Sequence, residues 1–192
     1  MDERMATHMK QRFPHGAAML VAQAVMADLE PSCERITIAG SIRRQRPDPA
    51  DIELLCIPRY DNVRSLFGAR PEKDLLAECI KDFIEKRVLD YRLNKIGLRI
   101  FGVKNKLLVH VASGIPLDVF STDARNWGLS LLVRTGPREF NIRYMAQLKA
   151  LGKAGHAYGG ITLEDGTEIE CPTEESAFQA ARWEWIEPSK RK

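Results

Sequence analysis

The sequence predicts an α+β protein with a sheet domain at residues 1–122 and a smaller, mostly helical domain at residues 123–192. Three observations predict this class. Short runs rich in β-branched residues alternate with helical stretches as far as residue 122. Two helical stretches then follow each other across a short turn. No low-complexity linker and no internal repeat interrupts the chain.

The sheet domain opens with a helix and two strands. The segment "PHGAAMLVAQAVMADLE" (14–30) has a proline that suits a first helical turn, followed by recurring alanine, leucine and methionine. "RITIAG" (35–40) is a short β-branched strand that ends in glycine. "DIELLCI" (51–57) alternates like a strand. Its two faces therefore carry Ile52, Leu54 and Cys56 on one side and Asp51, Glu53 and Leu55 on the other.

A second helix and further strands complete this domain. "PEKDLLAECIKDFIEKR" (71–87) has apolar residues at helical spacing. "LRIFGVKNKLLVHVA" (98–112) predicts a hairpin that turns near Lys104 and Asn105. "IPLDVFS" (115–121) predicts another strand.

The second domain is expected to begin with helices at about 124–134 and 138–151. A turn in "GKAGHAYGG" (152–160) and a small strand or hairpin follow. A short helix then starts from Thr173, because threonine is a good N-cap and Glu174 and Glu175 suit the positive end of a helix.

Composition limits the function classes. The 192 residues are 44% hydrophobic and 29% charged, as in an ordinary soluble protein, and the net charge of +3 permits nucleic-acid binding without requiring it. No apolar run is long enough to cross a bilayer, and the charged N-terminus lacks the apolar core of a signal peptide. We expect a cytoplasmic protein without a membrane partner. The cysteines (33, 56, 79 and 171) are scattered and expected to be packed, reduced thiols, and the histidines are isolated.

Acidic residues on two predicted strands suggest a metal site. Asp51 and Glu53 leave the same face of a strand, where their mutual repulsion favours a divalent ion with oxygen ligands. A solvated strand face is the alternative. Asp118 lies in an apolar run where a lone buried carboxylate is costly. If its strand pairs beside 51–57, it completes a three-carboxylate cluster suited to two-metal nucleotidyl transfer; otherwise it is a strand-end aspartate that reaches water.

The dipeptide Gly40-Ser41 follows a strand and is expected to open a short helix. A glycine lets a phosphate approach backbone N–H groups, Ser41 adds a hydroxyl donor, and Arg43 and Arg44 add charge-assisted bonds. The motif is weak by itself. Its meaning comes from the acidic pair about ten residues later.

These motifs together resemble a known family. "GSIRR" (40–44), "DIE" (51–53) and "LDV" (117–119) are similar to the signature of the nucleotidyltransferase superfamily. "NWGLSLLVRTGPREFNIR" (126–143) resembles the segment that joins palm to thumb in family X DNA polymerases, the polymerase beta-like group. "CPTEESAFQAARWEWIEPSKRK" (171–192) resembles the closing segment of that thumb, and "KQRFPHGAAML" (10–20) the helix entry before the palm.

The resemblance implies a palm with a mixed, mostly antiparallel sheet, followed by a small helical thumb with a short hairpin. It implies that a primer 3′-hydroxyl attacks the α-phosphate of a dNTP and releases pyrophosphate. Two Mg²⁺ ions, which Mn²⁺ can replace, would be held by Asp51, Glu53 and Asp118. The nucleotide would be bound by Arg12, Gly40, Ser41 and Arg44 at the phosphates, with Arg43 nearby, by Thr135 and Gly136 under the sugar, and by Asn141 at the base.

The chain departs from the family pattern at several positions. The second carboxylate is Glu53, where these polymerases usually have aspartate, and Pro116 stands where an arginine often supports the third carboxylate. Val133 and Arg134 replace an aromatic pair that commonly lies against the sugar, which leaves discrimination against ribonucleotides open. Arg138 occupies a position that is acidic in some relatives, so a guanidinium is expected to cover the base.

Other features leave alternatives open. Trp127, Trp183 and Trp185 either stack on bases or pack the thumb. Lys104 and Lys106, at the predicted hairpin tip, either contact a DNA backbone or are solvated. The tail "PSKRK" (188–192) is either a phosphate contact or a solubilising end.

The leading functional prediction is a Mg²⁺-dependent, DNA-directed DNA polymerase that fills gaps or performs short repair synthesis. It would act as a monomer on gapped or primer-template DNA with dNTPs, in the cytoplasm of a bacterium or of a virus- or phage-infected cell. The similarity is to minimal palm-plus-thumb forms, so no helix-hairpin-helix domain is expected before the palm. Two alternatives remain: a template-independent nucleotidyltransferase acting on a nucleic acid, protein or small molecule, and a catalytically silent nucleic-acid-binding module.

Overall fold

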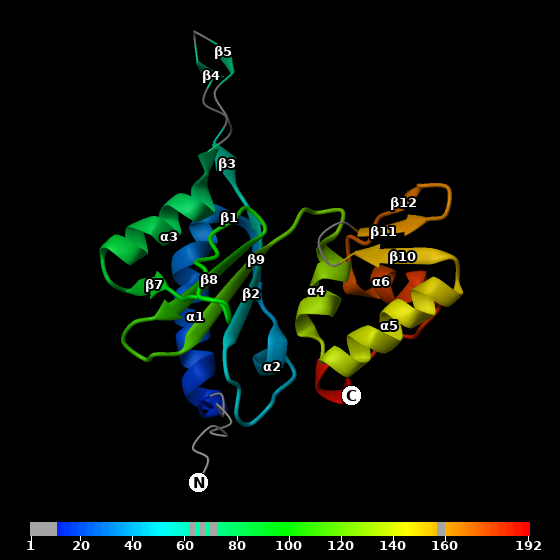
Figure 1. Ribbon diagram of the computed structural model, residues 1–192, viewed down its shortest axis with the longest axis horizontal. Coiled ribbons are helices and arrows are strands. Elements are labelled where there is room, and N and C mark those ends of the chain that lie inside the picture. The colour runs from blue at the N-terminus through cyan, green and yellow to red at the C-terminus, as the bar shows by residue number, and fades with distance from the viewer. Residues whose placement is uncertain (1–10, 62–63, 66–67, 70–72, 157–159) are drawn as a thin grey trace.

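The computed structural model describes residues 11–61, 64–65, 68–69, 73–156 and 160–192, which form two lobes side by side (Figure 1). The first lobe contains a central sheet and its helices. Its main elements are α1 (His15–Leu29), β1 (Cys33–Ile38), α2 (Gly40–Arg43), β2 (Ile52–Pro58), α3 (Leu75–Glu85), β7 (Leu89–Tyr91), β8 (Asn105–His110) and β9 (Pro116–Ser121). Two small ribbons project from it, β3 (Tyr60–Asp61) with β6 (Lys73–Asp74) and β4 (Arg64–Ser65) with β5 (Gly68–Ala69).

The central sheet has five strands in the order β1-β2-β9-β8-β7. The pairings are antiparallel except for β2 with β9, which run parallel. The sheet is therefore mixed and mostly antiparallel, which confirms the predicted α+β class. Because β2 and β9 are neighbours, residues of these two strands that share a register lie on the same face of the sheet.

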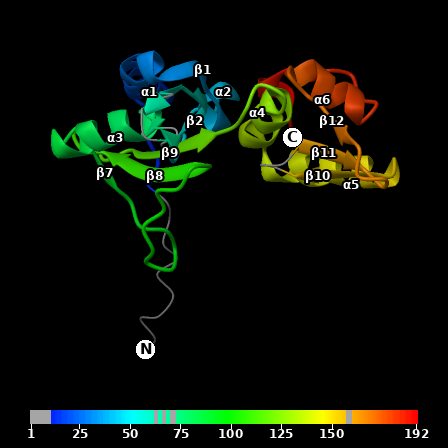
Figure 2. The same cartoon turned by 90° about the horizontal axis from the view of Figure 1, so that it is seen from above.

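Helices α1 and α3 cover one face of this sheet (Figure 2). The buried residues of β2 on that face are Ile52, Leu54 and Cys56, as the alternation predicted. The opposite face is covered only in part. There Leu55 and Phe120 pack against Trp127 and Leu131 of the second lobe, which joins the two lobes through a small apolar cluster.

The hairpin predicted at 98–112 is wrong in its first half. Only β8 forms a regular strand there, and its outer partner is β7, with Tyr91 opposite Leu108. Residues 98–103 instead make single bridges, such as Phe101 to Lys106. Lys106 is consequently not at an exposed tip. Its side chain is 1% exposed, and its Nζ lies 3.6 Å from Asp74 Oδ2, because the loop that carries Phe101 folds over it.

The second lobe packs three helices against a small sheet. Its elements are α4 (Trp127–Thr135), α5 (Arg138–Ala150), β10 (Lys153–His156), β11 (Gly160–Leu163), β12 (Glu168–Ile169) and α6 (Glu174–Ala180), before a final 3₁₀ turn, Pro188–Lys190. The expected small strand or hairpin is thus a three-stranded antiparallel sheet, and its first strand lies in the segment that was expected to be a turn. The Thr173 cap is confirmed, because its side chain accepts a hydrogen bond from the Ser176 N–H.

The tryptophans divide between packing and exposure. Trp127 is buried, and Trp183 is half-buried and packs edge-on against Phe140 and Tyr144. Trp185 is 45% exposed. The four cysteines are free thiols, and Cys33, Cys56 and Cys171 are buried.

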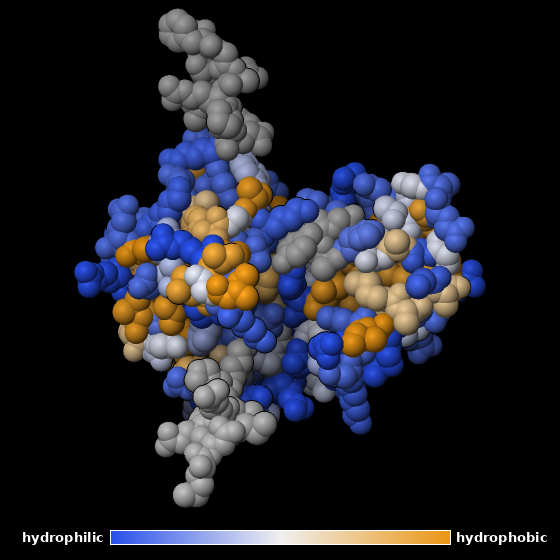
Figure 3. All heavy atoms as spheres, in the orientation of Figure 1, coloured by the Kyte–Doolittle hydropathy of each residue, from blue (hydrophilic) through white to orange (hydrophobic). Residues whose placement is uncertain are grey.

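The surface is mostly polar, with one apolar concentration on the sheet lobe. Figure 3 shows hydrophobic residues gathered over the front of that lobe, where the loop before β8 carries the exposed Leu93, Ile96, Leu98 and Val103. Among the residues that the structure describes, no helix is both long and apolar enough to span a membrane.

Candidate active site

Two of the three predicted carboxylates lie side by side on the open face of the sheet, and the third lies just ahead of strand β2. Glu53 of β2 is the register partner of Asp118 of β9, so their side chains leave the same face of neighbouring parallel strands. Asp51 lies two residues before Glu53, immediately ahead of β2, and its charge is among those that raise the pKa of Glu53. The pairing that the sequence could state only as a condition is therefore present.

Burial and the neighbouring carboxylates both raise the pKa of Glu53. Burial, and after it the nearby charges of Asp51 and Asp118, together raise the pKa of Glu53 to about 8. Arg134 and Arg44 act in the opposite sense. Glu53 therefore holds a proton at neutral pH unless a cation comes between it and the two aspartates.

Asp118 has an arginine partner that the sequence did not reveal. Arg92, which follows β7, forms an ion pair with Asp118 Oδ1. Arg92 is itself held against β8, because its N–H donates to the Leu107 carbonyl and its Nε donates to the Leu108 carbonyl at 3.3 Å. Pro116 cannot neutralise Asp118, but Arg92, which follows β7, supplies the positive charge instead.

Gly40 packs directly against the side chain of Glu53. A Cβ at position 40 would lie 1.9 Å from Glu53 Oε2, and Gly40 has φ +63°, a conformation that favours glycine. The following hydroxyl, Ser41 Oγ, is buried and has no hydrogen-bond partner among the described residues. Residues 40–43 form one helical turn, α2, as predicted.

Arg43 and Arg44 both reach into the second lobe. Arg43 donates to Thr135 Oγ1 at 2.7 Å and binds both carboxylate oxygens of Glu174 at 2.8 Å. Arg44 donates to the Thr135 carbonyl. Burial lowers the pKa of Arg44 from its usual value. The predicted phosphate-binding turn is thus also the main polar connection between the lobes.

Glu174 is the centre of that connection. It also accepts from Arg191 Nη1 at 2.8 Å and from the Trp185 indole at 3.2 Å, and it is only 5% exposed. Burial alone would raise its pKa, but the hydrogen bonds from Arg43 and Arg191 lower the pKa to about 2. Sequence reasoning gave Glu174 only a place in the first turn of a helix. The signal available was its position in the "TEE" motif.

A cavity of about 620 Å³ lies between the lobes beside the carboxylates. Arg44 and Glu53 line it from the first lobe, and Thr135, Gly136 and Asn141 line it from the second. Asn141 donates to the Val133 carbonyl at 2.7 Å, while its Oδ1 is buried without a partner in the described part of the chain. The structure therefore brings these five predicted residues to one cavity.

Two further arginines line the same cavity. Arg138 is exposed at its rim, and Arg134 lies 3.7 Å from the centre of the Phe120 ring. With Arg44, the described lining carries three guanidinium groups and one carboxyl group, that of Glu53. A cavity of this size and charge suits an anionic small molecule.

Arg12 is not brought to this cavity. Its Nη1 donates to the Asp48 carbonyl at 3.0 Å and lies 3.7 Å from Asp48 Oδ2, and its side chain is 60% exposed. It is absent from the described lining of the cavity. The predicted contact between Arg12 and a triphosphate therefore has no counterpart in this arrangement.

The carboxylates fit a metal ion in chemistry but not yet in arrangement. Across residues 11–61, 64–65, 68–69, 73–156 and 160–192, no three acidic, histidine or cysteine side chains form a group that could hold a metal ion. Asp118 points to Arg92, and the Glu53 carboxyl lies against Gly40. Three oxygen donors that repel one another are nevertheless the donor set that a hard divalent cation prefers.

No family model matches this chain, and no curated protein matches it either. The resemblance to family X polymerases therefore remains a prediction from the sequence motifs.

Proposed function

We propose that this protein is a metal-dependent nucleotidyltransferase that adds nucleotides to the 3′-hydroxyl of a DNA primer under the direction of a template. The observation that carries the proposal is the register of Glu53 with Asp118, which puts two carboxylates on one face of the sheet, with Glu53 in the wall of an arginine-lined cavity. Carboxylates beside a cationic cavity are the arrangement that transfer of a phosphoryl-linked group requires.

Each group of residues would contact a different part of the nucleotide or of the metal site. Arg44, Ser41 and the backbone at Gly40 would bind and orient the triphosphate, while Thr135 and Gly136 would support the sugar. Asn141 would contact the base through Oδ1, which has no partner in the described structure. Asp51, Glu53 and Asp118 would hold Mg²⁺. When bound, that ion would lower the pKa of the attacking hydroxyl and neutralise charge on the leaving pyrophosphate.

Arg92 would act as a positioning residue. It holds Asp118 by an ion pair and is itself anchored to the backbone of β8. In this role it replaces the support that Pro116 cannot give. Its removal would take away the ion pair that holds the Asp118 carboxylate in place.

A template-independent transferase is the second candidate. The observation in its favour is Arg138, an exposed cation at the rim of the cavity where a paired template base would have to fit. A guanidinium there can stack on the incoming base in place of template pairing.

Primer extension decides between these functions. The full chain is incubated with gapped or primer-template DNA and each dNTP singly, in Mg²⁺ or Mn²⁺. Incorporation that follows the template supports the first function, and incorporation indifferent to the template supports the second. Asp51→Asn should abolish either activity, whereas Asp48→Asn, at an exposed acid on the same loop, should not. Full activity in Asp51→Asn would refute the role of the carboxylates.

A further inference from the structure

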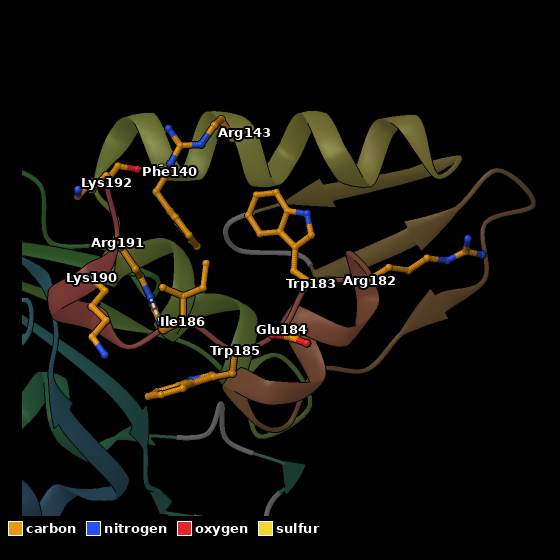
Figure 4. Close-up of a pocket in the computed structure, with 10 residues that line it drawn as sticks. All are labelled: Phe140, Arg143, Arg182, Trp183, Glu184, Trp185, Ile186, Lys190, Arg191 and Lys192. Carbon is orange, nitrogen blue, oxygen red and sulfur yellow. Dashed lines mark hydrogen bonds between the residues drawn. The ribbon is translucent and has the colours of Figure 1, made fainter.

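A second cavity, of about 570 Å³, opens on the other side of α5 (Figure 4). Phe140 and Arg143 of α5 form one wall, and the closing segment, residues 182–192, forms the other. The described residues that line it are different from those that line the first cavity. Its described lining is basic, with one acidic side chain, that of Glu184, and five cationic side chains: Arg143, Arg182, Lys190, Arg191 and Lys192. Arg143 also donates a hydrogen bond to the Lys192 main-chain oxygen.

One of these cations, Arg191, is buried and has one N–H group without a hydrogen-bond partner among the described residues. The Arg191 side chain is 0% exposed, its Nη1 binds Glu174 and its Nε donates to the Ile186 carbonyl at 2.9 Å. Its Nη2 is buried and has no hydrogen-bond partner among the described residues. Glu174 is shared between Arg191 and Arg43, so the cluster keeps a net positive charge. An oxygen anion in the cavity would satisfy this donor.

An aromatic ring faces the same space. Figure 4 shows Arg143 at one side of the cavity and Trp185 at the other. The Trp185 indole N–H donates to Glu174 Oε2 at 3.2 Å, which fixes the ring, yet the residue is 45% exposed. A fixed, half-exposed indole among cations is the combination that single-stranded nucleic acids recognise, because bases stack on the ring and phosphates bind the cations.

We propose that this cavity binds a single-stranded segment of nucleic acid, with a base on Trp185 and phosphates at Arg143, Arg182 and Arg191. Helix α5 places it beside the first cavity, since Asn141 lines that cavity and Phe140 and Arg143 line this one. Identifying the strand as the unpaired template beyond the primer rests on the proposed function. The binding of a single strand does not.

The test is fluorescence anisotropy of a labelled 12-nucleotide DNA strand with the full chain, without metal or dNTP. Trp185→Ala should weaken binding on the order of 10-fold, and Trp185→Phe much less, because a phenyl ring still stacks. The double variant Arg143→Ala/Arg182→Ala should reduce the slope of log K against log salt by about 1.4, about 0.7 for each lost phosphate contact.

Matched controls separate the cavity from general charge. Lys81→Ala/Lys149→Ala removes two exposed cations outside the cavity and should leave Kd and the salt slope unchanged. Thermal denaturation checks that each variant is folded. If Trp185→Ala unfolds the chain, the Kd and the salt slope of Trp185→Phe and of Arg143→Ala/Arg182→Ala still test whether the strand binds in this cavity.

Two results would overturn the proposal. The first is an unchanged Kd in both Trp185→Ala and Arg143→Ala/Arg182→Ala. The second is competition by free dAMP at the same concentration as the strand, which would make a mononucleotide the occupant. If the proposed polymerase function is wrong but this proposal is right, the result differs from both of these. In that case no nucleotide is incorporated, while the strand still binds and still responds to these variants.

Discussion

Replacing Glu174 by glutamine should destabilise the protein at neutral pH far more than at acidic pH. Glu174 holds Arg43 through both carboxylate oxygens and Arg191 through Oε1, all at 2.8 Å. The side chain of Arg191 is 0% exposed and that of Arg43 is 22% exposed. Glutamine keeps the shape of the side chain but leaves two guanidinium groups without their counter-charge. Breaking a buried pair in this way costs about 3–5 kcal/mol of unfolding free energy.

The pKa of Glu174 gives a second, independent magnitude. Despite burial, which raises it, the pKa is about 2 in the folded protein against an ordinary value of 4.5. A lowered carboxyl pKa contributes stability that is fully present above pH 4.5 and is lost as the pH falls toward 2. This difference of about 2.5 pH units corresponds to about 3 kcal/mol. The two magnitudes agree.

Urea unfolding followed by circular dichroism between pH 2 and 7 measures both effects. Circular dichroism is preferable to tryptophan fluorescence, because Trp185 contacts Glu174. The wild-type and Glu174→Gln stabilities should differ by about 3–5 kcal/mol at pH 7 and converge near pH 2. Glu175→Gln, at the exposed neighbouring residue, is the control and should change little. A difference below 1 kcal/mol, or one that stays constant with pH, would refute the reasoning.

Three further predictions follow from the site and its surroundings. In metal-free buffer, the raised pKa of Glu53 means that the unfolding free energy of the wild type falls by up to about 5 kcal/mol as the pH rises from 4.5 to about 8. Urea titrations of Glu53→Gln should lack this loss, whereas the control Glu85→Gln should keep it. Parallel stability-against-pH curves for the wild type and Glu53→Gln would contradict the prediction. Gly40→Ala should cost about 1–2 kcal/mol for its φ of +63° and more for the contact with Glu53; Gly97→Ala, at φ +76° with open space around it, should show only the first cost, so equal losses in thermal unfolding would exclude the contact. Lys106→Met should lower the unfolding free energy by about 3–5 kcal/mol, because it leaves the Asp74 carboxylate, which is 17% exposed, without its counter-charge; an unchanged or higher free energy in urea unfolding would mean that the ion pair with Asp74 does not stabilise the fold.

Local patterns in the sequence predicted the parts of the site that lie within single elements. The alternation in 51–57 correctly placed Glu53 and Leu54 on opposite faces, because a strand repeats every two residues. Asp118 could be added only on the condition that its strand lies next to 51–57. That neighbour relation depends on the order of strands in the sheet, and no short pattern encodes it.

The contacts that sequence reasoning missed join residues that are distant along the chain. Arg43 and Glu174 are separated by 131 positions, and Arg92 and Asp118 by 26. Neither pair leaves a periodic signal. Arg92 follows a strand of only three residues, β7, too short for alternation to be recognised. Lys106 was misplaced for a related reason, since its burial depends on a loop with isolated bridges.

The two adjacent arginines show how the lobes and the candidate site depend on each other. Both meet Thr135, Arg43 at the hydroxyl and Arg44 at the carbonyl, but only Arg43 is also neutralised by Glu174. Arg44 instead faces the cavity, where Glu53 and Asp51 are the nearby acidic charges. A triphosphate would therefore have to attract Arg44 away from a neutral carbonyl, which is a weaker partner than a charged oxygen. Arg43 would stay with Glu174 and keep the lobes together, so binding an anion at Arg44 need not separate them.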